Sequence, residues 1–299
     1  MIKFTGVKPR GIAISEDGLR WVELDSADGD AAISGSAFEP VPAGTVEPNF
    51  AKENIKDREL FKKCLLKAIP EGKRRGDIAL SLPDQLVRIV ILDFDELPQI
   101  RKEAEKLILW RIKKMLPIST EEAHIDYCIT GENGDKIQVL AAVAAKKVIR
   151  EYEDSLREIG LRPILVDIAS LNTLSLFLDE IEGDSIFVDI SGGEAVGIAL
   201  MADRELIFFR SKDLQGDIER VGQEIVSTLT YHKTRMPDLH IKRLYLACRQ
   251  SDYEAIENGL KNVFEGEICR LSLTDQLKDG LPSDKKSAFS PAIGGAMRL

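Results

Sequence analysis

An aspartate followed closely by two glycines is the pattern in this chain that most suggests chemistry. Asp189 lies inside an apolar run, and Ser191, Gly192 and Gly193 come directly after that run. Glycine turns let backbone N–H groups approach a phosphate, and an aspartate beside them can hold Mg²⁺ through water. A polar strand end next to a glycine hairpin turn explains the same residues without a ligand. The residues themselves leave both interpretations open.

Two similar series of short apolar runs predict the elements that position these residues. The runs Gly11–Ser15, Leu19–Leu24 and Ala31–Phe38 are separated by Asp-Gly turns, and the stretch Asp184–Arg210 repeats this three-strand pattern. Each meander continues into a helix and a further strand, which indicates a mixed α/β protein. Two duplicated halves around a cleft are the plan of the actin-like, ribonuclease-H-like fold.

The segment between the two series has a different character and predicts an inserted subdomain. A long strand, 86–94, precedes a helix over 101–116, in which Leu109 and Trp110 fall outside the main apolar stripe. This second strip suggests a second contact surface. Two strands and a helix ending near Ile159 complete the unit. We therefore predict three domains: residues 1–82 plus 161–183, residues 83–160, and residues 184–299.

Composition limits the classes of partner. The net charge of −9 is spread along the 299 residues, which argues against nucleic acid and against direct docking on anionic lipid. The longest strongly apolar run, 139–145, is far too short to insert into a bilayer. The four cysteines are far apart and form no CxxC pair, which favours reduced thiols in a cytosolic compartment. The three histidines have no metal-ligand spacing, so we predict no metal site.

Several longer stretches resemble one known family. They are SLPDQLVRIVILDFDELP, LILWRIKKMLPISTEEAHIDYCI, VGQEIVSTLTYHKTRMPDLHIKRLYLA and the ending FSPAIGGAMRL. In order and over nearly the whole chain they are similar to the PilM proteins of type IV pilus assembly, which are relatives of FtsA and of the cytoplasmic part of the type II secretion L component. The resemblance implies an actin-like ATPase fold of two ribonuclease-H-like halves, with an inserted subdomain of the FtsA/PilM type in the first half.

The resemblance also implies a function and a partner. It implies a cytoplasmic scaffold of a type IV pilus or type II secretion platform, held at the inner membrane by capturing the cytoplasmic tail of a PilN-like bitopic membrane protein. The tail would lie in a groove between the first domain and the inserted subdomain. Backbone hydrogen bonds and apolar pockets would hold it there. We expect Leu97, Trp110, Leu116 and Pro117 to line this groove, with Trp110 as the anchor.

Departures from the family pattern predict that nucleotide chemistry is lost. Where the family has Asp-Ile-Gly before its first phosphate turn, this chain has Ala13, Ile14 and Ser15, and Glu16 and Asp17 add negative charge beside the expected phosphate. The adenosine motif, normally a Gly-Gly turn, is replaced by residues 248–251. Only about ten residues stand between Arg210 and Val221, where the family carries a subdomain that encloses the nucleotide, and these are too few for a domain.

These departures predict that the chain is a pseudo-ATPase and has no cofactor. Asp189, Ser191, Gly192 and Gly193 would then be a residual phosphate turn. The alternative is an active ATP-binding ATPase of the same fold, with Asp189 positioning Mg²⁺. A sugar-kinase-like enzyme is a third hypothesis, but the sequence has no convincing carboxylate for a second substrate.

Overall fold

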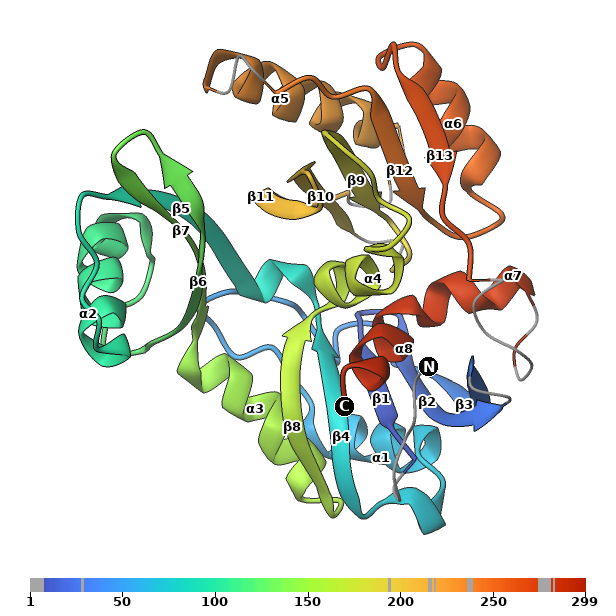
Figure 1. Ribbon diagram of the computed structural model, residues 1–299. Helices are drawn as coiled ribbons and strands as arrows, with labels where there is room; N and C mark the ends of the chain where they lie inside the picture. The colour runs from blue at the N-terminus through green and yellow to red at the C-terminus, as the bar shows by residue number, and fades with distance from the viewer. Residues whose placement is uncertain are drawn as a thin grey trace.

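The structure, a computed structural model, describes residues 8–27, 30–192, 195–214, 217, 219–235, 239–273, 281 and 283–299. Over these ranges the chain forms two large β-sheets and a smaller third one, with helices packed on their faces (Figure 1). Figure 1 shows the sheet built from the N-terminal strands below the sheet built from the C-terminal half, with the small sheet beside both. The chain is therefore mixed α/β, as predicted.

Among the described residues, the first sheet consists of β1 (Arg10–Ile14), β2 (Gly18–Ala27), β3 (Asp30–Pro40), β4 (Gly76–Leu82) and β8 (Leu161–Ile168). Its order is β3-β2-β1-β4-β8: the first three strands form an antiparallel meander, and β4 and β8 run parallel to β1. The three strands predicted from the N-terminal runs are confirmed. Because β4 pairs with β1 and β8 pairs with β4, strand β8 lies at one edge of this sheet.

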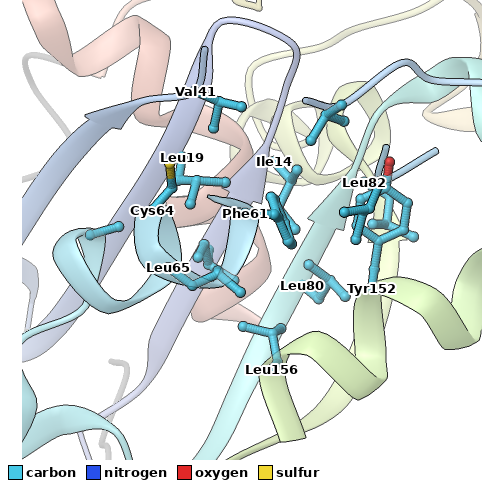
Figure 2. Close-up of a cluster of buried hydrophobic side chains, with 14 of the residues drawn as sticks. Ile14, Leu19, Val41, Phe61, Cys64, Leu65, Leu80, Leu82, Tyr152 and Leu156 are labelled. Carbon is cyan, nitrogen blue, oxygen red and sulfur yellow. The ribbon is translucent and has the colours of Figure 1, made fainter. Parts of the chain in front are cut away.

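Two helices cover one face of the first sheet, α1 (Arg58–Ala68) and α3 (Lys146–Arg157). Asp57 begins α1 because its side chain accepts a hydrogen bond from the Leu60 backbone N–H. Phe61 of α1 meets Tyr152 of α3 edge-on, with ring centroids 6.3 Å apart (Figure 2). Helix α3, which we grouped with the inserted subdomain, thus shares the core of the first sheet.

The other face of the first sheet is covered by α4 (Ala169–Phe177) and by the last helix, α8 (Ser290–Met297). Helix α8 packs on β1 so closely that a Cβ at Gly11 would lie 1.9 Å from the Ala292 carbonyl oxygen. The end of the chain therefore returns to the sheet in which it starts (Figure 1). The three domain ranges stay predictions. Helix α3 of the second range and helix α8 of the third both pack on the sheet of the first.

In the part of the chain that is described, the second sheet consists of β9 (Ser185–Asp189), β10 (Ala195–Ala202), β11 (Glu205–Asp213), β12 (Arg243–Ala247) and β13 (Glu267–Arg270). Its order, β11-β10-β9-β12-β13, repeats that of the first sheet: a meander followed by two parallel strands. Helices α5 (Arg220–Arg235) and α6 (Tyr253–Lys261) pack on it. The predicted duplication is confirmed.

The third sheet lies between β4 and β8 in the sequence. Its order is β5-β7-β6, all antiparallel, and helix α2 packs on one face. The bounds are β5 (Val87–Phe94), β6 (Ala123–Asn133), β7 (Lys136–Ala145) and α2 (Arg101–Ile112), followed by the 3₁₀ turn η3 (Lys113–Met115). The strands of the inserted unit lie where they were predicted, whereas the helix predicted over 101–116 ends at Ile112 and continues as η3.

The remaining elements are short. They are the 3₁₀ turns η1 (Glu71–Lys73), η2 (Asp84–Leu86) and η4 (Ser287–Phe289), and helix α7 (Ser283–Lys286). Strand β11 ends at Asp213 and α5 begins at Arg220, so the second half has no room for a subdomain at this point. None of the described helices is long and apolar enough to cross a lipid bilayer.

The contact between α4 and α8 gives a first prediction. A Cβ at Gly294 of α8 would lie 1.9 Å from the Asn172 backbone oxygen of α4, whereas a Cβ at Gly259 of α6 would meet nothing within 4 Å. We expect Gly294→Ala to lower the free energy of unfolding by at least about 1–3 kcal/mol, because two backbones must separate. Gly259→Ala, the matched control, should raise it by up to about 1 kcal/mol through helix propensity. Urea denaturation measures both; equal effects would contradict the close packing.

Candidate functional site

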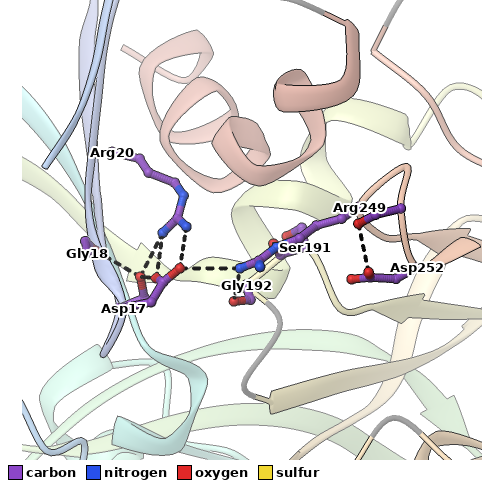
Figure 3. A network of polar contacts seen from close by, with 9 residues as sticks. Asp17, Gly18, Arg20, Ser191, Gly192, Arg249 and Asp252 are labelled. Carbon is purple, nitrogen blue, oxygen red and sulfur yellow. Dashed lines mark hydrogen bonds and ion pairs between the residues drawn. The ribbon is translucent and has the colours of Figure 1, made fainter. Parts of the chain in front are cut away.

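One arginine connects the two turns at which this fold could hold phosphates. Arg249, just after β12, donates from Nη2 to the Gly192 carbonyl oxygen at 2.7 Å and from Nε to the Ser191 carbonyl oxygen at 3.3 Å. The same Nη2 lies 3.4 Å from Asp17 Oδ2 in the turn between β1 and β2 (Figure 3). A single guanidinium thus bridges both halves.

Asp17 is neutralised inside the protein. Arg20 donates from Nη1 to Asp17 Oδ1 at 2.8 Å and from Nη2 to Oδ2 at 2.6 Å, a bidentate ion pair. Figure 3 shows Arg20 and Arg249 reaching this carboxylate from two sides. Burial by itself would raise the pKa of Asp17, but the hydrogen bonds and charge of Arg20, with Ser15 and Arg249, hold it below its usual range. Of the two acidic residues in the first turn, Asp17 is therefore matched by two arginines, whereas Glu16 is exposed.

The second turn presents acceptors where a phosphate needs donors. A phosphate turn directs backbone N–H groups at the anion. Here the carbonyl oxygens of Ser191 and Gly192 point at the Arg249 guanidinium, and the Ser191 N–H donates to Asp189 Oδ1 at 2.9 Å. A Cβ at Gly192 would meet nothing within 4 Å, so space remains beside the turn. Gly193, the last residue of the predicted turn, lies outside the described residues.

Asp189 ends β9 and is almost fully buried, with 3% of its surface exposed. Burial raises its pKa above the usual range, while the hydrogen bond from the Ser191 N–H opposes this. No group of three or more His, Cys, Asp or Glu side chains that could hold a metal ion occurs among the described residues. The Asp189 carboxyl group is therefore held in the interior by its hydrogen bond from Ser191. Of the predicted residual turn, the structure describes Asp189, Ser191 and Gly192, which lie close together.

A second buried carboxyl group lies nearby and was not predicted. Asp84, in the turn after β4, accepts hydrogen bonds from the backbone N–H and the hydroxyl of Ser170, the second residue of α4. A Cβ at Gly197 of β10 would lie 2.1 Å from the Ser170 hydroxyl oxygen, so this pair packs directly on the second sheet. Burial raises the pKa of Asp84 to about 7, and the charges of Asp189 and Asp167 add to the effect. An aspartate directly after Pro83, at a strand end, was the available sequence signal.

The turn that replaces the adenosine motif contributes Arg249 to the contact between the two phosphate turns. Cys248 before it is buried, which raises the pKa of its thiol to about 12. After it, the Ser251 hydroxyl donates to Asp252 Oδ1 at 2.7 Å. In the sequence this stretch stands out only by its lack of a Gly-Gly turn. The bridging role of Arg249 was missed because both of its partners are distant in sequence.

A groove separates the first sheet from the inserted sheet. It has a volume of about 360 Å³ and runs along β8, the edge strand of the first sheet. Ile164 of β8 is 53% exposed beside it, and Ala142 and Ala144 of β7 face it from the inserted sheet. An ion pair of Arg298 with Asp167 closes one side. The position of this groove matches the predicted one, whereas its residues were not predicted.

The four residues predicted to line that groove are not brought together. Leu97 packs against the core of the inserted unit, and Trp110, 60% exposed, lines a separate groove between α2 and β6. Leu116 packs against the same core as Leu97 and also lines a third cleft, between β5 and β11. Pro117 is exposed in the loop after η3. None of these four is among the residues that line the β8 groove. Their part in binding a tail stays a prediction.

Comparison with known proteins now identifies the family. A model of the family described as type IV pilus assembly protein PilM matches residues 11–235. The chain belongs to this family. No curated protein sequence matches it significantly.

Solved structures extend the likeness. A structure described as a PilM–PilN type IV pilus biogenesis complex has a TM-score of 0.78 at 18% identity, over 98% of each chain. The cytoplasmic domain of EpsL, an inner membrane component of the type II secretion system of Vibrio cholerae, has a TM-score of 0.56 at 8% identity, over 97% of this chain and 94% of that one. A Bacteroides thetaiotaomicron protein with an actin-like ATPase fold and unknown function has a TM-score of 0.51 at 14% identity, over 91% and 94%. The fold is actin-like.

The buried Asp84 carboxyl group predicts a pH dependence of stability. Its pKa in the folded chain, about 7, lies above the ordinary 3.8, so the folded state binds this proton more tightly than the unfolded state. The stability it contributes is complete below about pH 4 and is lost as the pH rises to about 7, at about 1.4 kcal/mol per pKa unit. We expect wild type to lose stability relative to Asp84→Asn over this range by a few kcal/mol. Urea denaturation of both at several pH values tests this; parallel curves would refute it.

Proposed function

We propose that this chain is a cytoplasmic scaffold of a type IV pilus inner-membrane platform that binds the cytoplasmic tail of a PilN-like membrane protein and is held at the membrane by it. The observation that carries the proposal is the groove beside the exposed edge of β8. Membership of the PilM family and the likeness to a structure solved as a PilM–PilN complex support the same role. The likeness to EpsL supports a related place in type II secretion as the alternative setting.

The groove suits an extended peptide. Strand β8 ends its sheet, and Pro163 within it lacks a backbone N–H, which fits an edge position. An extended tail could add a strand to this edge, with main-chain hydrogen bonds for affinity. Ile164 and Val166 of β8, with Ile89 of β5 and Ala142 of β7, offer apolar contacts for alternate side chains of the tail. The tail would thus join the first sheet to the inserted unit.

We also propose that the chain does not hydrolyse ATP. Arg249 already binds the carbonyl oxygens of the second turn and Asp17 of the first, so a phosphate would have to displace these contacts. The connection between β11 and α5 is too short to enclose an adenine. The second candidate is an ATP-binding protein of the same fold, which the buried Asp189 at its strand end and the space beside Gly192 favour.

A thermal shift measurement separates these two candidates. A ligand that binds only the folded state, at about 100 times its dissociation constant, stabilises by about 2.7 kcal/mol and moves the melting temperature by several degrees. We expect no shift for the wild-type chain in millimolar ATP with Mg²⁺. A clear, Mg²⁺-dependent shift would instead support the ATP-binding candidate.

The Arg249→Ala variant should have a lower melting temperature than wild type, because the Ser191 and Gly192 carbonyl oxygens and the Asp17 carboxylate lose their shared donor.

Tail binding can be tested at Ile164. The probe is a synthetic peptide with the cytoplasmic sequence of the bitopic protein encoded next to this chain. We expect Ile164→Arg to weaken its binding at least tenfold, or about 1.4 kcal/mol, because a charge would replace an apolar wall of the groove. Ile129→Arg is the matched control, since Ile129 is 59% exposed on β6 and Ile164 is 53% exposed.

Isothermal titration with both variants and with Trp110→Ala completes this test. The control should bind as wild type does. Equal binding by Ile164→Arg and wild type would contradict the β8 groove. A loss of peptide binding confined to Trp110→Ala would instead place the tail in the groove between α2 and β6.

A further inference from the structure

The second groove of the inserted unit, between α2 and the first residues of β6, has an apolar floor and a basic rim. Its volume is about 730 Å³. The floor is formed by Leu109 and Trp110 of α2 and by Ala123 and Ile125 of β6. Four lysines surround it: Lys102, Lys106, Lys113 and Lys146. Of the lining glutamates, Glu105 is paired with Arg101 at 3.2 Å.

The four rim lysines outnumber the two glutamates of the groove. Glu105 is paired with Arg101, and the charge of Lys146 acts on the Glu121 carboxylate, which leaves Lys102, Lys106 and Lys113 as excess positive charge in the described part of the rim. Lys146 donates from Nζ to the backbone oxygen of Glu121 at 2.7 Å, and the Lys113 ammonium lies 5.6 Å from the Trp110 ring centroid. Six basic and two acidic side chains occur between residues 101 and 114, in a chain whose net charge is −9. This is a local basic surface on an acidic protein.

Trp110 and β6 indicate the shape of what would bind. Trp110 is 60% exposed at the groove, and large aromatic side chains dominate the energetics of interfaces. Strand β6 is at the edge of its sheet, so in the described part of the chain one side of its backbone has no neighbouring strand. An extended segment fits such an edge. A flat bilayer fits a concave groove poorly.

We propose that the groove between α2 and β6 binds an acidic, extended segment of a partner protein. An apolar side chain of the segment would pack on Trp110, and its carboxylates would pair with Lys106 and Lys113. This surface differs from the β8 groove in all but one lining residue: Ala123 and Ile125 line only the α2 groove, Asp126 lines only the β8 groove, and His124 lines both. The inference therefore does not depend on the proposed tail binding.

The test uses the full chain and a phage-displayed library of random peptides of about twelve residues. We expect the selected peptides to be enriched in Asp and Glu. Lys106→Glu with Lys113→Glu should bind them at least tenfold more weakly. Lys52→Glu with Lys63→Glu, at two other exposed lysines, is the matched control and should bind as wild type does. Added salt should weaken binding, since the contacts are between exposed charges.

Tryptophan fluorescence locates the bound peptide. The chain has two tryptophans; Trp21 is buried at 2% exposure, so a change on binding reports Trp110. We expect a blue shift with the selected peptides, and none in the Lys106→Glu, Lys113→Glu variant. Peptides without acidic enrichment, or equal binding by that variant, would overturn the proposal. So would a Trp110 shift with phosphatidylglycerol vesicles in the absence of any peptide binding, since this would make the surface a membrane contact.

Discussion

The structure depends on one shared cation at the boundary between its two halves. In a nucleotide-binding protein of this architecture, a bound anion and its metal would connect the two phosphate turns. Here the Arg249 guanidinium makes that connection, with the carbonyl oxygens of Ser191 and Gly192 on one side and Asp17 on the other. The cation belongs to the chain itself, just after β12, so no ligand has to bind for the contact to form. The relation of the halves is set by the chain itself.

A second polar contact acts at the same boundary. Asp84 and Ser170 come from the first half and pack on Gly197 of the second sheet, where any side chain would collide with the serine hydroxyl. A buried carboxyl group is costly when ionised, but removing either partner would leave the other without its hydrogen bond. Two polar contacts between the halves, one made by Arg249 and one by Asp84 and Ser170, therefore oppose hinge motion. Such rigidity suits a protein that offers fixed surfaces to partners.

Local sequence patterns were enough for the elements and not for the site. Apolar runs and their turn residues, Asp-Gly in the first half and Gly-Gly in the second, predict both meanders because neighbouring strands in the sequence pair locally. Arg249 joins Gly192 and Asp17, which are 57 and 232 residues away, and only the packing of both sheets brings them together. Leu97, Trp110 and Leu116 looked like one surface because they are close in sequence. The fold instead packs Leu97 and Leu116 against the core of the inserted unit, whereas Trp110 lines the groove between α2 and β6.

The inserted sheet explains how one small unit can offer two grooves. Successive side chains of a strand point to opposite faces, so the first residues of β6 divide between them. Ala123 and Ile125 face α2 and Trp110, whereas Asp126 belongs to the groove beside β8. The two grooves differ in chemistry: the β8 groove is bounded by an Asp167–Arg298 ion pair, and the α2 groove by four lysines and two glutamates. The two grooves have only His124 in common among their lining residues, so substitutions at Lys106 and Lys113 change the α2 groove and a substitution at Ile164 changes the β8 groove.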